Sequence, residues 1–539
     1  MISFLTTIPY LVASLRTPTG FVFSGVLTAY DDTFAYFAWM RQGANLQLLM
    51  CDPYTSEPQH CEFFLPLWSL LGFIARATGL SIPLTFHAIR LLSALLLLVV
   101  AKSVAGLVVE SRTQLKYTLW LYATSGGLGW LVFGLENKGN LLGGAAGSGS
   151  VDLNLPEAIA FRSIFAQVHF CVGVALLSAA ICLFFKAAVE KNTIRAFISG
   201  LLTSLLAVIH PYMVAVVCAV SAVALLLLPL IGKRRNEIDG INVYSSRVPV
   251  AGGFAIGTVP GVGYLIYLNR SNEVLREWLR VTDTFSPPAW EYALGFGFVG
   301  VLGLMGLSVI WTRHNQYGRL LSIWVAVQAL LLYFPVSFQR RFVEGLQLPL
   351  SIAASVALFE IANRILRNNN RKYYRNAILV GSIMLAALTN IGFLVGQLSG
   401  RGEASGANDP RRYLSNDVIS AFDWLRAKST PETVLFSSYL TGNIAPSMTG
   451  MRVFLGHYAQ TLRSDEKGPL VTAFYSNTVG DHEIRKLFAE HRVRYIFYGP
   501  FERAISDAFV PAPWLRLSHR VGDVVIFEMP DQVSPPEIQ

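Results

Sequence analysis

The feature that most constrains the fold of this chain is a series of long apolar runs that recur through its first 400 residues. Each run has roughly 17–25 residues, enough for a helix to cross the ~30 Å hydrocarbon core of a bilayer. Backbone polar groups find no water inside lipid, so such runs are expected to be helical. The chain is 53% hydrophobic and only 14% charged, which is typical of a polytopic α-helical membrane protein.

About eleven crossings are predicted near 4–26, 83–109, 117–135, 159–186, 195–211, 212–231, 249–268, 291–312, 319–335, 347–366 and 376–398. The shorter run 63–79 contains Pro66, Gly72 and Arg76, and it is expected to be a helix that lies on the membrane surface. With this assignment, the loops on one side carry sixteen basic residues and those on the other carry eight. The positive-inside rule therefore predicts a cytoplasmic N-terminus and an extracytoplasmic C-terminal segment.

The composition changes near residue 400, where a Gly/Ser-rich stretch begins. We therefore predict a transmembrane domain at 1–400, a linker at 401–414 and a small extracytoplasmic α/β domain at 415–539. Within this domain, capping and periodicity predict helices at 415–429 and 482–493 and strands at 433–439, 452–458, 494–499 and 524–529. The segment 438–461 is rich in Gly, Asn, Ser and Thr, and it is expected to be a loop that could close over an active site.

Charge and motifs exclude several classes of protein. The net charge of +9 does not indicate nucleic-acid binding, because the basic residues cluster in short loops between apolar runs. The sequence contains no P-loop, HExxH, CxxC pair or GxSxG motif, which argues against a P-loop pump or a metalloprotease. Cys51 and Cys61 bracket a polar loop, so they could form a disulfide if that loop faces an oxidising compartment.

The stretch GVLTAYDDTFAYFAWMRQG, residues 25–43, puts Asp31 and Asp32 side by side in an aromatic and aliphatic neighbourhood. One of them could be no more than a helix N-cap, but a cap requires only one such residue. Two carboxylates at a membrane boundary are costly unless they bind a cation or transfer protons. Because adjacent acids repel, one is expected to have a raised pKa unless a metal or an arginine is near, and a raised carboxylate pKa suits a general base.

Other polar residues lie in the segments expected on the same side of the membrane. Glu157 follows Pro156, and it is either a first-turn helix acid or a further catalytic acid that reaches Asp31 and Asp32. His60 is a candidate metal ligand together with these two aspartates, with a hydrated loop as the alternative. His210 precedes Pro211 between two apolar runs, and a buried histidine there needs a polar partner. Arg340 and Arg341 suit a phosphate group, and pairing with outer carboxylates is the alternative.

Taken together, the pattern DD-x3-YF-x2-MRQG, PYTSEP, PE before a span, HP between spans, an outer RR and a late TGN…P…TG…V…GH resembles the GT-C superfamily. These integral-membrane glycosyltransferases use sugars linked to polyprenyl phosphate. The likeness spans the whole chain and is nearest to a bacterial branch with a C-terminal α/β domain. The absence of a WWDxG motif argues against transfer of a whole oligosaccharide to asparagine.

The resemblance implies an inverting transfer of one sugar to a glycan, lipid or protein acceptor outside a bacterial inner membrane. Asp31 or Asp32 would be the catalytic base or would bind a divalent metal, Mg or Mn. Arg340 and Arg341 would hold the donor phosphate, and further substrate contacts are expected from His210, Arg162, His457 and Tyr36. The expected partners are the lipid-linked donor, the acceptor and membrane lipids, without nucleic acid. An oligosaccharyltransferase-like enzyme and a non-enzymatic lipid-linked-sugar transporter or flippase are the alternatives.

Overall fold

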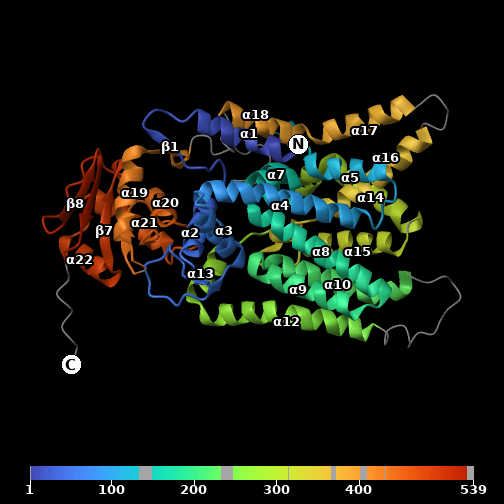
Figure 1. The fold of residues 1–539 in the computed structure, drawn as a ribbon, viewed down its shortest axis with the longest axis horizontal. Coiled ribbons are helices and arrows are strands. Elements are labelled where there is room, and N and C mark those ends of the chain that lie inside the picture. The colour runs from blue at the N-terminus through green and yellow to red at the C-terminus, as the bar shows by residue number, and fades with distance from the viewer. Residues whose placement is uncertain are drawn as a thin grey trace. The chain divides into compact units, whose positions relative to one another are not determined.

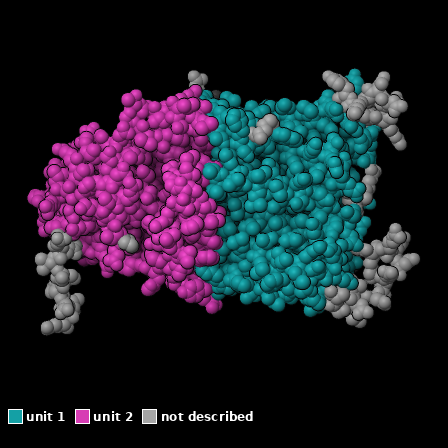
Figure 2. All heavy atoms as spheres, viewed as in Figure 1, with its two compact units in different colours: residues 1–9, 88–266, 283–399 teal, residues 10–87, 267–282, 400–539 magenta. Residues whose placement is uncertain are grey.

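The chain is mainly helical, and the computed structural model describes residues 2–132, 149–231, 247–313, 315–365, 372–400, 409–430 and 432–530. It divides into two compact units (Figure 2). The first unit combines Met1–Pro9, Ala88–Ile266 and Asp283–Ser399, and the second combines Tyr10–His87, Tyr267–Thr282 and Gly400–Gln539. The domain bounds predicted from the sequence stay a prediction, and residues 401–408 of the expected linker lie outside the described residues.

The first unit is built from helices (Figure 1). Within it, α14 packs against α16, α8 against α9, and α10 against α15. Three helices contain the boundaries between the units: α1 (Ile2–Leu15), α4 (Ile82–Ala105) and α12 (Val248–Ser271). The other helices of this unit are α5 (Arg112–Thr124), α6 (Val151–Asn154), α7 (Ala160–Ala166), α8 (Val168–Glu190), α9 (Thr193–Ile209), α10 (Tyr212–Ile231), α14 (Ala289–Arg313), α15 (Gln316–Leu331), α16 (Gln347–Ile365), α17 (Lys372–Ala386) and α18 (Leu388–Ser399), with short 3-10 turns η1 (Gly129–Leu131), η3 (Pro156–Ala158) and η4 (Gln339–Val343).

Six of the described helices are long and apolar enough to cross a membrane, namely α4, α8, α10, α12, α14 and the helix that includes α16. The pair α17 and α18, bent by 47°, would add a seventh, and α1 and α9 are apolar but shorter. The predicted class, a helical multi-pass membrane protein with a small sheet-containing C-terminal region, is confirmed. The number of eleven crossings stays a prediction.

Several predicted spans have wrong bounds: the runs 159–186 and 376–398 are each divided into two helices, and two others end early for a local reason. The run 4–26 contains a helix only to Leu15, because Pro18 disfavours helix in the residue before it and Gly20 adopts a positive φ of 84°. The run 117–135 contains α5 only to Thr124, where two glycines follow a Ser125 cap. The surface helix expected at 63–79 is α3 (Pro66–Thr78), whose 13 residues span ~20 Å, less than the ~30 Å of a hydrocarbon core.

The second unit contains a five-stranded mixed sheet in the order β6-β5-β7-β9-β8. The central strands β5 and β7 run parallel, whereas β9 is antiparallel to both β7 and β8. Phe436, Phe474 and Phe488 are among the aromatic side chains of its core. The strands are β5 (Val434–Phe436), β6 (Arg452–Val453), β7 (Val493–Tyr498), β8 (Arg516–Val521) and β9 (Val524–Glu528), and the helices beside them are α19 (Asn416–Lys428), α20 (Tyr439–Thr449), α21 (Ser464–Tyr475), α22 (Asp481–Glu490) and α23 (Pro500–Arg503).

Early residues of the chain belong to this same unit. Strand β1 (Phe21–Phe23) pairs antiparallel with β4 (Tyr413–Ser415), and β2 (Leu49–Met50) pairs with β3 (Phe63–Phe64). Helix α2 (Tyr30–Ala44) packs against α3 and also against α20. Helix α13 (Glu273–Val281) completes the unit. The acidic motif on α2 therefore lies beside elements that follow it by about 400 residues in the sequence.

Four predicted strands and two predicted helices of the C-terminal segment are present near their expected positions. The prediction of a loop over 438–461 is wrong, because α20 occupies its first half. Its N-terminus is capped by Ser438, whose side chain accepts a hydrogen bond from the Thr441 backbone, and it ends at Gly450 with a positive φ of 81°. Burial against neighbouring elements stabilises this helix despite a composition that is typical of turns.

Candidate active site

Asp31 and Asp32 lie in the first turn of α2, where the helix dipole favours negative charge. The N-cap position belongs to Ala29, which has no side-chain cap hydrogen bond, so neither acid is the N-cap of this helix. Ala29 adopts a left-handed backbone with φ 49° and ψ 53°, which a residue with a Cβ rarely does and which costs on the order of 1 kcal/mol. The strain directly before the two acids is a feature typical of functional sites.

Asp31 is fixed by three neighbours from the second unit. Its Oδ1 accepts hydrogen bonds from Arg411 Nη1 at 2.9 Å and from the Tyr439 hydroxyl at 2.7 Å. Its main-chain carbonyl accepts one from Asn443 Nδ2 at 3.3 Å. Partial burial alone would raise the pKa of Asp31, but the charge and hydrogen bond of Arg411, with help from Tyr439, hold it below the ordinary value. Asp31 is therefore an oriented, ionised carboxylate at neutral pH.

Arg411 is the buried centre of this arrangement, with a side chain only 7% exposed. It donates to both carboxylate oxygens of Asp409, from Nε at 2.9 Å and from Nη2 at 2.7 Å. The Nη1 that binds Asp31 also donates to Asn443 Oδ1 at 2.8 Å. A planar guanidinium can make such a fork to two partners, whereas a lysine ammonium cannot. Arg411 thus ties the acid on α2 to the C-terminal segment of its own unit.

Asp32 differs from its neighbour, because its side chain is 49% exposed. Its Oδ1 lies 3.5 Å from Nε2 of His457, a side chain that is only 1% exposed. His457 Nδ1 accepts hydrogen bonds from the backbone N–H groups of Ala459 and Gln460, each at 3.2 Å. A neutral His457 must therefore carry its proton on Nε2, the nitrogen that faces Asp32. The two acids have different partners: Asp31, whose side chain is 32% exposed, pairs with a cation, whereas Asp32, 49% exposed, lies beside an imidazole donor.

Two glycines allow this part of the site to form. A Cβ at Gly442 on α20 would come within 1.9 Å of the Leu455 carbonyl oxygen. A Cβ at Gly456 would come within 2.4 Å of the Gly442 carbonyl oxygen. Only glycines permit this approach of backbones, which brings α20 with Asn443 next to the turn that holds His457. The glycines of the TGN and GH motifs therefore have a packing role.

A second polar cluster lies in the first unit, at the turns before α10 and α16. Arg341 Nη1 is 3.1 Å from Glu157 Oε1 and 3.9 Å from Glu344 Oε1. His210 Nε2 is 2.5 Å from Glu344 Oε2, which supplies the polar partner expected for this histidine. Glu157, Glu344 and His210 are buried, whereas the side chain of Arg341 is 26% exposed. The carboxylate pairing weighed as the alternative for Arg341 is thus present; its phosphate role stays a prediction.

The remaining predicted residues have these surroundings. Arg162 donates to the Leu153 carbonyl at 2.9 Å and lies over the Phe393 ring. Tyr36 stacks on Trp68, with ring centroids 4.4 Å apart, and His60 is exposed. The predicted disulfide is present between Cys51 and Cys61, whose Cα atoms are 4.2 Å apart. Because Glu157 and Asp31 belong to different units, an approach between them stays a prediction.

A divalent metal would need oxygen ligands that are not already committed to a cation. Among the described residues, no group of three or more His, Cys, Asp or Glu side chains could hold a metal ion. Asp31 and Asp32 are two carboxylates, and Oδ1 of Asp31 is shared with the guanidinium of Arg411. This donor set fits a metal poorly, since Arg411 already supplies the positive charge.

Sequence reasoning missed Arg411, Asp409, Tyr439 and Asn443. Arg411 and Asp409 fall in the segment predicted as a linker, where the charged run NDPRRY was the only local signal. Tyr439 and Asn443 fall in the segment predicted as a loop. Asn443 belongs to the TGN motif, but nothing in that motif indicates that its side chain contacts Asp31.

Comparisons with known proteins bear on the fold. No family model and no curated protein sequence matches this chain. Among solved structures, ArnT from Cupriavidus metallidurans bound to undecaprenyl phosphate is 11% identical, with 99% of each chain covered and a TM-score of 0.53. Arabinofuranosyltransferase AftD from Mycobacteria is 12% identical with a TM-score of 0.52, and the likeness covers 98% of this chain but only 40% of AftD. The chain has the fold of the GT-C membrane glycosyltransferases.

Proposed function

We propose that this chain is a glycosyltransferase that transfers a sugar from a polyprenyl-phosphate-linked donor to an acceptor on the extracytoplasmic side of a bacterial inner membrane. The observation that carries the proposal is the pair of acids on α2, with Asp31 oriented and held ionised by Arg411 and Tyr439. The fold shared with ArnT, whose structure was solved with undecaprenyl phosphate, supports a lipid-linked donor.

In the proposed reaction, an acceptor hydroxyl attacks C1 of the donor sugar from the face opposite the phosphate. The new C1–O bond forms as the bond to the phosphate oxygen breaks, so the configuration at C1 inverts. Asp31 takes the hydroxyl proton, and polyprenyl phosphate leaves with the bonding electrons. Such base catalysis is worth roughly 10²–10⁴ in rate.

Asp32 and His457 are proposed to bind the acceptor. The exposed carboxylate of Asp32 can accept a hydrogen bond from a hydroxyl, while the proton on His457 Nε2 can be donated to the same or a neighbouring oxygen. The 3.5 Å separation of these two polar atoms leaves both within reach of one substrate group. The two acids would then have unequal roles, one in proton transfer and the other in binding.

Arg341, with Arg340 beside it, is proposed to stabilise the departing phosphate. Arg341 is 26% exposed and pairs with the buried Glu157 at 3.1 Å, and a guanidinium has five N–H donors with which to bind an anion as well as a carboxylate. Glu157 would then orient Arg341 and would not act as a second base. Preorganised charge at the leaving group is commonly the largest single contribution to catalysis.

The test compares Asp31→Asn, Asp32→Asn and the control Asp423→Asn, whose side chain on α19 is 52% exposed. The purified full chain is incubated with polyprenyl-phosphate sugars and envelope extracts, and released polyprenyl phosphate and sugar transfer are measured. Asp31→Asn should lose at least ~100-fold in transfer. The control should match the wild type. If both Asp31→Asn and Asp32→Asn keep full transfer, the catalytic roles are wrong.

The same preparations separate an enzyme from a transporter or flippase. In vesicles, a flippase would move the intact lipid-linked sugar between leaflets without releasing polyprenyl phosphate, and Asp31→Asn would have little effect. Release of polyprenyl phosphate that depends on both Asp31 and an acceptor supports the glycosyltransferase. Translocation without any release would refute it.

A further inference from the structure

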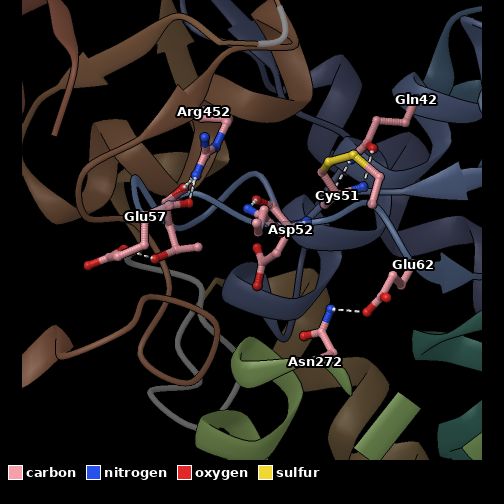
Figure 3. The surroundings of a disulfide bond; sticks show 10 residues. Gln42, Cys51, Asp52, Glu57, Glu62, Asn272 and Arg452 are labelled. Carbon is pink, nitrogen blue, oxygen red and sulfur yellow. Dashed lines mark hydrogen bonds between the residues drawn. A yellow bond between two sulfur atoms is a disulfide. The ribbon is translucent and has the colours of Figure 1, made fainter. Parts of the chain in front are cut away.

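The loop between Cys51 and Cys61 is held in place on several sides (Figure 3). The side chain of Gln42 on α2 forms two hydrogen bonds with the backbone of Cys51, at 2.9 and 3.0 Å. Arg452 donates to the carbonyl oxygens of Thr55 and Glu57 at the far end of the loop. Lys467, only 3% exposed, pairs with Glu57 at 2.8 Å. The loop is therefore a fixed part of the second unit.

Within this loop, Tyr54 is fully buried and has no role in the reaction proposed above. Asp52 orients its backbone, because Asp52 Oδ1 accepts from the Tyr54 N–H at 2.8 Å. The two polar ends of Tyr54, its hydroxyl and its main-chain carbonyl, both take part in hydrogen bonds with the C-terminal segment of the same unit. Each of these hydrogen bonds connects Tyr54 to the partners of one acid, either Asp31 or Asp32.

The hydroxyl of Tyr54 is connected to Asp31 through Asn443. Tyr54 Oη donates to the main-chain carbonyl of Asn443 at 3.0 Å. The side chain of Asn443 accepts from Arg411 Nη1 at 2.8 Å and donates to the main-chain carbonyl of Asp31 at 3.3 Å. Asn443 is fully buried, so its orientation depends on these few partners. Tyr54 thus fixes the residue that aligns Arg411 with the Asp31 carboxylate.

The main-chain carbonyl of Tyr54 is connected to Asp32 through Thr461 and His457. It accepts a hydrogen bond from the Thr461 hydroxyl at 2.8 Å. The oxygen of that hydroxyl in turn accepts from the backbone N–H groups of Gly456 and His457, at 3.2 and 3.1 Å. The Tyr54 ring also lies beside the imidazole, with centroids 5.6 Å apart. These contacts fix the turn from which His457 presents Nε2 to Asp32.

We infer that Tyr54 is a positioning residue for the active site: from one buried side chain and its backbone, it sets the geometry of both the Arg411–Asp31 pair and the His457–Asp32 pair. The inference rests on the proposed function, because the two pairs that Tyr54 positions have a catalytic role only in that reaction. Tyr54 itself takes no part in the chemistry. The loop closed by the disulfide then holds in place the active-site residues on α2, on α20 and on the turn after α20.

Tyr54→Phe is the sharpest test, because it removes only the hydroxyl and retains the ring and the carbonyl bond to Thr461. Loss of that hydrogen bond should loosen Asn443 and weaken the hold of Arg411 on Asp31. The pKa of Asp31 should then rise, and the acid limb of the kcat/KM–pH profile should move to higher pH by about half a unit or more. The kcat should fall about fivefold.

Tyr475→Phe is the matched control. Tyr475 is also fully buried in the second unit, and its hydroxyl donates to the main-chain carbonyl of Phe497 at 2.6 Å, within the core. Both variants should lower the unfolding temperature, but only Tyr54→Phe should move the pH profile. Equal pH profiles for Tyr54→Phe and Tyr475→Phe, or for Tyr54→Phe and wild type, would overturn the inference.

A second measurement needs no substrate, so the inference can be tested even if the proposed function fails. In a double-mutant cycle on unfolding, Tyr54→Phe and Asn443→Ala should be non-additive because the two residues belong to one network. The pair Tyr475→Phe and Asn443→Ala should be additive. Additivity in both cycles would refute the positioning role, whereas a wild type without transfer activity would refute only the proposed reaction.

Discussion

Replacement of Arg411 by glutamine should destabilise the protein in a way that depends on pH. The wild-type side chain makes four hydrogen bonds, two to Asp409, one to Asp31 and one to Asn443. Removal of one partner from a buried ion pair costs roughly 3–5 kcal/mol. Because the side chains of Asp31 and Asp409 are 32% and 18% exposed, solvent screening reduces the expected loss to roughly 2–4 kcal/mol at neutral pH.

The sign of the pH dependence follows from Asp31. In the wild type its folded pKa is depressed, so its contribution to stability is present above the unfolded pKa of about 3.9 and is lost as pH falls through the folded pKa. Without Arg411, burial is the largest influence left and is opposed only by Tyr439 and His457, so the pKa of Asp31 rises above its wild-type value. The charged carboxylate then stabilises the variant less than the wild type at neutral pH, and protonation removes this difference on acidification.

The difference in unfolding free energy between wild type and Arg411→Gln should therefore be largest near pH 7 and shrink toward pH 4. Unfolding of the purified full chain in detergent, followed between pH 4 and 8, measures this difference. Arg411→Lys should fall between the two proteins, since it keeps the charge but loses the fork. The control Arg426→Gln removes an exposed pair with Asp423 and should cost only about 0–1 kcal/mol. A difference that stays constant across this pH range would refute the electrostatic role of Arg411.

Two further predictions concern the first unit and the topology. Arg341→Ala should lower kcat/KM for the donor about 10-fold or more, because a charge-assisted contact to phosphate is worth roughly 1.5–3 kcal/mol. Arg364→Ala, which removes an exposed pair with Glu360, serves as the control, and an unchanged kcat/KM for Arg341→Ala would make Arg341 a structural residue. A single cysteine at an exposed position within 405–415, such as Pro410, should react with a membrane-impermeant reagent from the extracytoplasmic side, as the excess of basic residues in the opposite loops predicts. Labelling only from the cytoplasm would reverse the predicted orientation.

The sequence was sufficient for the class of fold. Apolar runs long enough to cross a bilayer and a change to soluble composition near residue 400 predict a helical membrane protein with an appended α/β region, and both are present. These features are local, because the length and hydrophobicity of a run decide whether it can be a membrane helix. Helix ends were less predictable: Pro18 stops α1 early, and Gly126 follows the end of α5.

The sequence was also sufficient to single out Asp31 and Asp32, since two adjacent acids among aromatic residues are unusual in so apolar a chain. Their different surroundings could not be predicted. The partners of Asp31 are Arg411, Tyr439 and Asn443, which lie 380, 408 and 412 residues away in the sequence. Contacts of that separation leave no periodicity or spacing that one sequence can reveal.

Tertiary structure alone decided which acid pairs with Arg411 and which lies beside His457. It also placed α20 where the composition predicts a turn, because burial against α2 and the backbone approach of Gly442 and Gly456 outweigh weak helix propensity. Amino-acid composition and hydrophobic periodicity are properties of a single helix or strand, so the sequence alone shows them. Charge pairing and close packing act between elements, so the unequal environments of Asp31 and Asp32 exist only once the second unit has folded.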